Sequence, residues 1–163
     1  MNRIPKFACV ECDADAPAAV VWRIVTDVTR TGEWSGENQG NTWIDGATAA
    51  RVGARFRGRN RQGRSRWTRV CKVTALEDER VLVWQTVWTW LHPDVTEWHI
   101  ELTPIADERT HLVLRYEVAR ASFFVDRLYY ILVPAHRDRT EALSRDLERL
   151  ADLAHREYLA LLS

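Results

Sequence analysis

The part of this chain between residues 41 and 119 alternates apolar and polar side chains over several consecutive runs. A period of two is typical of β-strands that bury one face and expose the other to water. Turn-forming segments such as Gln62-Gly63 separate the runs and favour antiparallel hairpins. The expected strands are Asn41 to Asp45, Gly53 to Arg61, Arg64 to Leu76, Arg80 to Trp90, Val95 to Ile105 and Thr110 to Ala119. Together they predict an antiparallel meander with one buried face.

Helical patterns lie on both sides of this predicted sheet. A further strand, about Lys6 to Asp13, precedes an amphipathic helix with Asp15 as its expected N-cap, and a short helix from Thr29 to Trp34 follows. The last part of the chain predicts an uninterrupted helix from about Asp138 to Leu162. At about 1.5 Å per residue, that helix is long enough to cross the whole sheet. The expected fold class is α+β, with a sheet of about seven strands, two short helices after the first strand and a long C-terminal helix.

The length and composition of the chain bound its organisation. It has 163 residues, of which 46% are hydrophobic and 28% are charged, and this predicts one globular domain over residues 1–163. No apolar run approaches the roughly 20 residues of a membrane span, and the first ten residues lack the apolar core of a secretion signal. We therefore expect a cytoplasmic protein without a transmembrane segment. The pattern does not determine the oligomeric state.

Positive charge is concentrated in one stretch. The net charge of the chain is zero, but the stretch from Arg51 to Lys72 contains no acid. Arginines at alternating positions share one face of a strand; they are Arg55, Arg57, Arg59 and Arg61. Such a stripe is either a solvated outer face or a contact surface for a protein, a nucleic acid or an anionic membrane. We expect a solvated face and no nucleic-acid partner.

The cysteines do not indicate a metal site. Cys9 and Cys12 form a Cys-x-x-Cys pattern, but residues three apart on a strand face opposite sides. No second pair of cysteines or histidines completes four zinc ligands, and the sequence lacks a nucleophile motif and a phosphate-binding glycine loop. We predict no metal and no cofactor, and the sequence assigns no catalytic residue.

Eight tryptophans are the strongest indication of function. An aromatic side chain buries roughly 150 to 250 Å², so several rings on one side of a sheet either fill a solid core or line a cavity. We interpret them as cavity lining, because buried indole N–H groups need partners that a partly polar pocket supplies. The predicted ligand-binding residues on the inward parity are Phe56, Trp67, Trp84, Thr86, Trp88, Trp98 and Tyr116.

Arg69 is also predicted to bind ligand. It shares the parity of Trp67, so its guanidinium points inward unless a β-bulge reverses the parity. A buried arginine needs a negative partner. The expected partner is Asp27, Glu33, Glu37 or an acidic ligand.

Tyr129 completes the predicted site. It lies in the apolar segment from Phe123 to Val133, which is either a lid or membrane-touching segment, or plain packing under the long helix. In either case its hydroxyl is expected at the cavity rim. A transient membrane contact is therefore one of the expected interactions.

Several local motifs follow one another in an order that resembles the order found in a known superfamily. They are Asp15-Ala16-Pro17-Ala18-Ala19-Val20-Val21-Trp22, Trp43-Ile44-Asp45-Gly46, Gly53-Ala54-Arg55-Phe56-Arg57-Gly58 and Trp98 to Pro104. In this order the chain resembles the SRPBCC superfamily, the helix-grip fold of START lipid-transfer domains, birch-pollen-type allergens and polyketide cyclase/dehydrase-like proteins. The resemblance implies a curved sheet that grips the C-terminal helix, with a cavity between them for a hydrophobic or amphipathic small molecule.

Three functions remain open on these grounds. The first is storage, transport or sequestration of a hydrophobic small molecule in the cavity. The second is an enzyme of the polyketide aromatase/cyclase kind, which needs convergent polar groups in a similar pocket. The third is a protein-interaction module that uses the basic face. We rank them in this order, and a fold alone does not decide among them.

Overall fold

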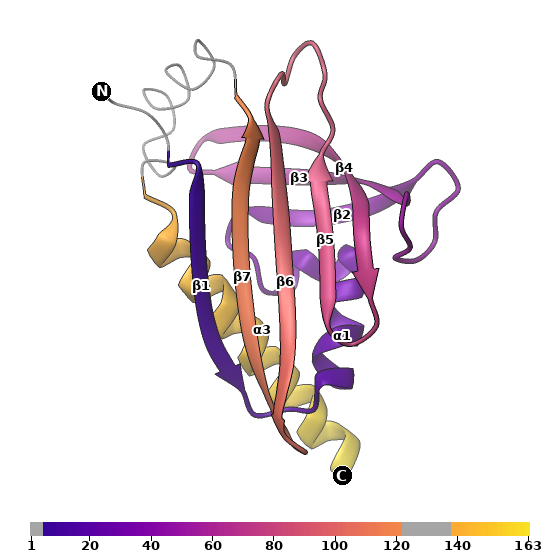
Figure 1. Cartoon of the computed structure of the whole chain (residues 1–163), viewed down its shortest axis with the longest axis vertical. Helices are drawn as coiled ribbons and strands as arrows, with labels where there is room; N and C mark the ends of the chain where they lie inside the picture. Colours follow the sequence, from indigo (N-terminus) through magenta and orange to yellow (C-terminus); the bar gives the residue numbers. More distant parts are fainter. Residues whose placement is uncertain (1–4, 122–137) are drawn as a thin grey trace.

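A strongly curved antiparallel sheet wraps around one long helix in the computed structural model, which describes residues 5–121 and 138–163 (Figure 1). The seven strands lie in the order β1-β7-β6-β5-β4-β3-β2, so only β1 departs from chain order, by pairing with β7. The strands are β1 (Phe7–Ala14), β2 (Asn38–Ile44), β3 (Arg55–Gln62), β4 (Ser65–Glu77), β5 (Val81–Thr86), β6 (Val95–Ala106) and β7 (Arg109–Arg120). The predicted α+β helix-grip architecture is confirmed.

The two short helices follow β1 as predicted. They are α1 (Ala18–Thr26) and the 3-10 helix η1 (Val28–Glu33). Asp15 does not cap α1: Pro17 occupies the N-cap position, and no side chain caps this end. The helix begins at Ala18, so Asp15 lies before the N-cap position, and proline has no side-chain acceptor with which to cap it. The carbonyl of Pro17 accepts hydrogen bonds from the N–H groups of Val20 and Val21. The side chain of Asp27 instead accepts a hydrogen bond from the backbone N–H of Thr29 at the start of η1.

Strand alternation sorts the two faces of the sheet as the sequence predicts. Along β3, Phe56 and Gly58 are buried, whereas Arg57, Arg59 and Arg61 are exposed. The basic stripe is therefore on the outer face of the sheet. The same rule separates Cys9, which is exposed, from the half-buried Cys12 on β1.

The end of β5 differs from the prediction. The strand stops at Thr86 instead of continuing to Trp90. Val87 still donates its N–H to the carbonyl of Val70, but the next residues close a tight turn in which Thr89 and His92 bond to each other. The alternation that the sequence shows beyond Thr86 therefore belongs to a projecting loop.

The long helix α3 (Thr140–Leu162) packs across the concave side of the sheet, mainly against β1 (Figure 1). Its inner stripe is almost completely excluded from water, with Leu147, Leu150 and Ala154 all 0% exposed. None of the described helices is long and apolar enough to cross a membrane. The segment from Phe123 to Val133, including Tyr129, lies outside the described residues.

Candidate functional site

A cavity of about 420 Å³ lies between the concave face of the sheet and the N-terminal part of α3. Its described walls come from η1, from the inward side chains of β2 to β7, and from the first turns of α3. Sites for small molecules usually enclose roughly 300–1,000 Å³. The sheet and helix therefore do not close into a solid core at this end of the molecule.

One wall of the cavity is a row of aromatic rings across three strands. Trp84 on β5 is opposite Trp98 on β6, which in turn is opposite Tyr116 on β7. The two indoles are stacked, with ring centroids 6.2 Å apart and planes 8° apart, and the Tyr116 ring lies 5.1 Å from Trp98. The Tyr116 hydroxyl donates to the carbonyl of Pro5, and burial raises its pKa. Strand register thus brings two parallel indoles and a tilted phenol ring together in one aromatic wall.

A second wall is polar and contains three asparagines from β2 and β3. The Nδ2 of Asn38 donates to the Oδ1 atoms of Asn41 at 2.8 Å and Asn60 at 3.1 Å. Asn41 in turn donates to the carbonyl of Val28 at the start of η1. A side chain at Gly58 would place its Cβ only 2.7 Å from Asn41 Oδ1, so the amide network requires a glycine there.

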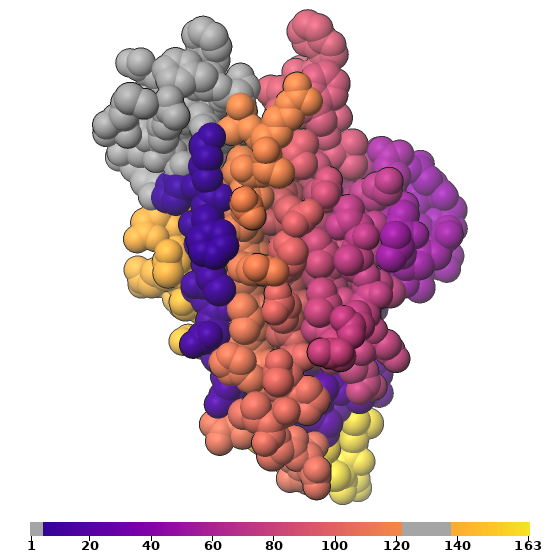
Figure 2. Space-filling view, in the orientation of Figure 1, coloured from indigo at the N-terminus to yellow at the C-terminus, as the bar shows by residue number. Residues whose placement is uncertain are grey.

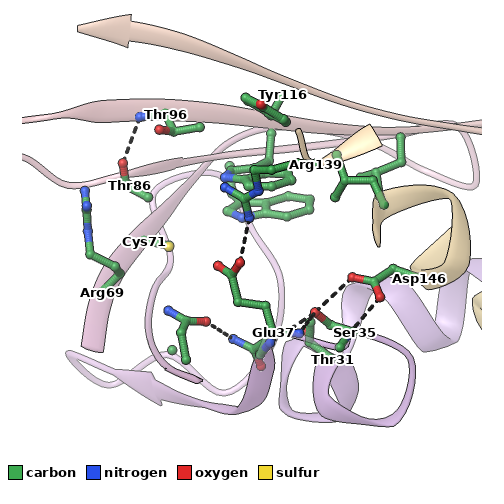
Figure 3. Close-up of a pocket in the computed structure, with 18 of the residues that line it drawn as sticks. Thr31, Ser35, Glu37, Arg69, Cys71, Thr86, Thr96, Tyr116, Arg139 and Asp146 are labelled. Atoms are coloured by element: carbon green, nitrogen blue, oxygen red, sulfur yellow. Dashed lines mark hydrogen bonds and ion pairs between the residues drawn. The ribbon is translucent and has the colours of Figure 1, made fainter. Parts of the chain in front are cut away.

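An ion pair projects into the middle of the cavity (Figure 3). Arg139, which precedes α3, donates from Nη2 to Glu37 Oε2 at 2.9 Å. Its guanidinium carbon also lies 5.2 Å from the Trp98 ring centroid and 5.4 Å from that of Tyr116. Such cation–π contacts strengthen when water is excluded, and both charged side chains are mostly buried. The positive charge is therefore held against the aromatic wall.

A second ion pair lies at the other side of the cavity. Arg69 points inward, as its parity predicts, and its side chain is only 10% exposed. Its partner is Asp94, which receives two bonds from Nη1 at 3.0 and 2.9 Å, while Nη2 donates to the Asp94 carbonyl. The expected partners Asp27, Glu33 and Glu37 are therefore wrong. Asp94 comes from the loop before β6, not from a strand or helix.

Asp146 ties α3 to the segment before β2. Its carboxylate accepts from the backbone N–H of Gly36 at 2.9 Å and from the hydroxyl of Ser35 at 3.3 Å (Figure 3). Arg149 lies 3.4 Å from the same carboxylate. Burial of the side chain raises the pKa of Asp146, although these contacts act in the opposite direction.

Most of the predicted ligand-binding residues surround this cavity. Its lining includes Phe56, Trp67, Arg69, Trp84, Thr86, Trp98 and Tyr116. Trp88 does not line it: the side chain is 42% exposed and lies under the guanidinium of Arg120, 5.7 Å from the ring centroid. The prediction for Trp88 fails because β5 ends at Thr86, after which alternation no longer fixes direction. Tyr129 lies outside the described residues.

The histidines on the sheet and in the turn lie away from this cavity. His99 bonds to Glu97 at 2.7 Å, and His111 bonds to Asp13 at 2.7 Å on the outer side of the sheet. His92 is in the projecting turn. Within residues 5–121 and 138–163, no group of three or more histidine, cysteine or acidic residues is placed to hold a metal ion.

Comparison with known proteins decides the family. The family model for polyketide cyclase/dehydrase and lipid transport proteins matches residues 10–154. The chain belongs to this family. Comparison with curated protein sequences gives no match.

Solved structures share the polyketide cyclase/dehydrase family fold along almost the whole chain. The Zhui aromatase/cyclase from Streptomyces sp. R1128 has a TM-score of 0.69 and 17% identity, covering 92% of this chain and 93% of that one. Protein MLL2253 from Mesorhizobium loti has a TM-score of 0.65 and 20% identity, covering 92% and 97%. The di-domain StfQ from the steffimycin biosynthetic pathway has a TM-score of 0.64 and 14% identity, covering 92% of this chain and 45% of StfQ. Identities this low show a common fold.

Sequence reasoning missed several polar residues of the cavity in this family member. The sequence predicts a turn at Asp94 and the beginning of the long C-terminal helix at Arg139, and neither pattern indicates a cavity residue. Asp146 directly precedes the fully buried Leu147. A charged residue at the border of an apolar helical stripe is expected to face the solvent, so the sequence gives no sign that Asp146 lines the cavity. The one available signal was the parity of Arg69, which demanded an acid nearby.

Replacement of Asp94 by asparagine is expected to destabilise the protein, because the mostly buried Arg69 loses its counter-charge. Removal of one partner from a buried pair costs about 3 kcal/mol or more of unfolding free energy. The matched control is Asp45→Asn, which breaks the exposed pair between Asp45 and Arg55 and should cost less than about 1 kcal/mol. Urea unfolding measures the loss of unfolding free energy in both variants. Equal costs would contradict the assignment of Asp94 as the partner of a buried charge.

The raised pKa of Asp146 predicts a pH dependence of stability. The folded protein holds this proton to a higher pH than the unfolded chain, whose ordinary value is 3.8. The associated stability is complete below pH 3.8 and is lost as pH rises through the folded value. Wild type should therefore lose unfolding free energy relative to Asp146→Asn as the pH increases from 3.8. Glu148→Gln, at an exposed position of α3, controls for net charge. The prediction is wrong if the difference in unfolding free energy between the wild type and Asp146→Asn stays constant with pH.

Proposed function

We propose that this protein binds one amphipathic small molecule with a flat, unsaturated part in the cavity, for storage, transport or sequestration. The observation that carries the proposal is the contrast between two walls of one cavity. The stacked rings of Trp84 and Trp98 form an apolar surface, whereas Asn38 and Asn60 contribute amide groups from β2 and β3. A planar ligand gains stacking on the first wall and hydrogen bonds on the second.

The charges of the cavity favour a ligand without net charge. Arg69 and Arg139 each have a carboxylate partner within hydrogen-bonding distance. An anionic ligand would have to displace Asp94 or Glu37, which would leave a partly buried carboxylate without its counter-charge. A neutral molecule with carbonyl or hydroxyl oxygens can accept hydrogen bonds from the guanidinium groups and leave both pairs intact. Quinones and aromatic polyketides have this character.

A cyclase or dehydrase activity is the second candidate. It is favoured by the position of Arg139, whose guanidinium lies over the rings of Trp98 and Tyr116 and bonds to Glu37. A fixed cation beside a ligand carbonyl stabilises the enolate that forms during aldol closure. In such a reaction the Glu37 carboxylate, which is bonded to the same guanidinium, would be the candidate to exchange a proton with the ligand. The Zhui aromatase/cyclase has the same fold as this chain.

Titration with a panel of fatty acids, quinones and aromatic polyketides tests the binding proposal. We expect tight one-to-one binding of a neutral planar compound and a loss of at least tenfold in affinity for Trp98→Ala, because the variant removes half of the stacked pair. The matched control is Trp88→Ala, which removes a tryptophan outside the cavity and should leave the affinity unchanged. Isothermal titration calorimetry measures all three proteins.

Two results would contradict the binding proposal. One is the absence of binding by any class in the panel, and the other is an equal loss of affinity in Trp88→Ala and Trp98→Ala. Mass spectrometry of the recovered ligand separates binding from catalysis. If the ligand is recovered unchanged, the protein is a carrier. If the wild type forms a product that has lost one water, and Arg139→Met does not form it, the protein is an enzyme.

A further inference from the structure

The loop between β5 and β6 carries the most exposed large apolar side chains among the described residues. Trp90 is 91% exposed and Leu91 is 87% exposed. They are the two residues between Thr89 and His92, whose backbones bond to each other. The loop that contains them, residues 87–94, projects beyond the end of the sheet (Figures 1 and 2). Single exposed apolar residues are common on proteins, but an adjacent tryptophan and leucine on a protrusion mark an interaction site.

The tip has a defined conformation. Thr89 and His92 exchange backbone hydrogen bonds of 3.0 and 3.1 Å across Trp90 and Leu91. The N–H of His92 also donates to the hydroxyl of Thr89 at 3.0 Å. A turn closed in this way holds both apolar side chains outward before any partner arrives. Binding through the tip therefore costs little ordering of the loop.

The base of the loop is anchored to the sheet and carries no uncompensated negative charge. Asp94 is the sole acid in residues 87–94, and its carboxylate is bound by Arg69. Trp88 packs under the guanidinium of Arg120 at the end of β7. Burial, together with the positive charge of Arg69, lowers the pKa of His92, so its imidazole is neutral at pH 7. The loop thus presents an apolar tip above a cationic base.

We propose that the Trp90–Leu91 tip inserts into the interfacial region of a lipid bilayer. Tryptophan prefers the boundary between headgroups and acyl chains, and a neighbouring leucine adds apolar area that enters below it. Two side chains are too small for a specific protein interface, which usually buries about 800 Å² on each partner. A bilayer needs no complementary shape. Arg120 at the base favours anionic headgroups.

Docking in this orientation brings the cavity close to the bilayer, because Asp94 belongs both to the anchored end of the loop and to the cavity wall. An amphipathic molecule could then pass between the two without crossing bulk water. The membrane contact itself goes beyond the proposed function and does not depend on it. If the protein binds vesicles but no small molecule, the membrane contact stands and the proposed function is wrong.

Co-sedimentation with sucrose-loaded vesicles of phosphatidylcholine, with and without phosphatidylglycerol, tests the inference. We expect the protein to bind, with higher affinity for the anionic vesicles, and the double variant Trp90→Ser/Leu91→Ser to bind on the order of a hundredfold more weakly, because each buried side chain contributes about tenfold. The matched control is Leu161→Ser/Leu162→Ser, which removes two exposed leucines from the far end of α3. It should bind like the wild type. Circular dichroism confirms that both variants are folded.

Absence of vesicle binding by the wild-type protein would overturn the inference, as would equal losses in the two double variants. Self-association in ultracentrifugation that disappears in Trp90→Ser/Leu91→Ser, without vesicle binding, would show that a second copy of the chain occupies the tip. Acyl chains carrying bromine give an independent measurement, because bromine quenches nearby indoles. Wild-type emission should fall with brominated vesicles and should fall much less for Trp90→Phe; equal quenching would count against insertion of Trp90.

Discussion

The cavity exists because α3 is attached to the rest of the molecule in two different ways. Its middle and later turns bury Leu147, Leu150 and Ala154 completely, and this apolar contact closes one half of the curved sheet. Near its beginning Leu143 is buried too, but here Arg139 and Asp146 add hydrogen bonds from the helix to the segment before β2. Close packing joins the helix to the sheet at one end, and directional bonds hold it over the cavity at the other.

Strand register determines the chemistry of each wall. Antiparallel pairing brings Trp84, Trp98 and Tyr116 into one transverse row, because each lies at the same height on its strand. A second row contains Gly58, which is paired with both Asn41 and Arg69. Since a Cβ at Gly58 would collide with the Asn41 amide, the missing side chain makes room for a polar wall. A slip of one residue would turn these groups outward.

The sequence predicts the strands, the long helix and most of the inward residues because these depend on local periodicity. The period of two directed Trp67, Trp84 and Trp98 toward the cavity that they line. The same rule gave the wrong direction for Trp88, because the strand ends before this residue and alternation does not fix the direction of side chains in a loop. The charge partners were beyond such reasoning, because a contact such as Arg69 to Asp94 depends on how a loop folds back over its neighbours.

Native mass spectrometry of the freshly purified protein shows whether the space under the first turns of α3 holds a small molecule. We expect a complex of one chain with one small molecule, either as isolated or after incubation with a neutral planar compound, and we expect the complex to dissociate on collisional activation. If only the mass of the free chain is detected under both conditions, the space is not a binding site for such a molecule.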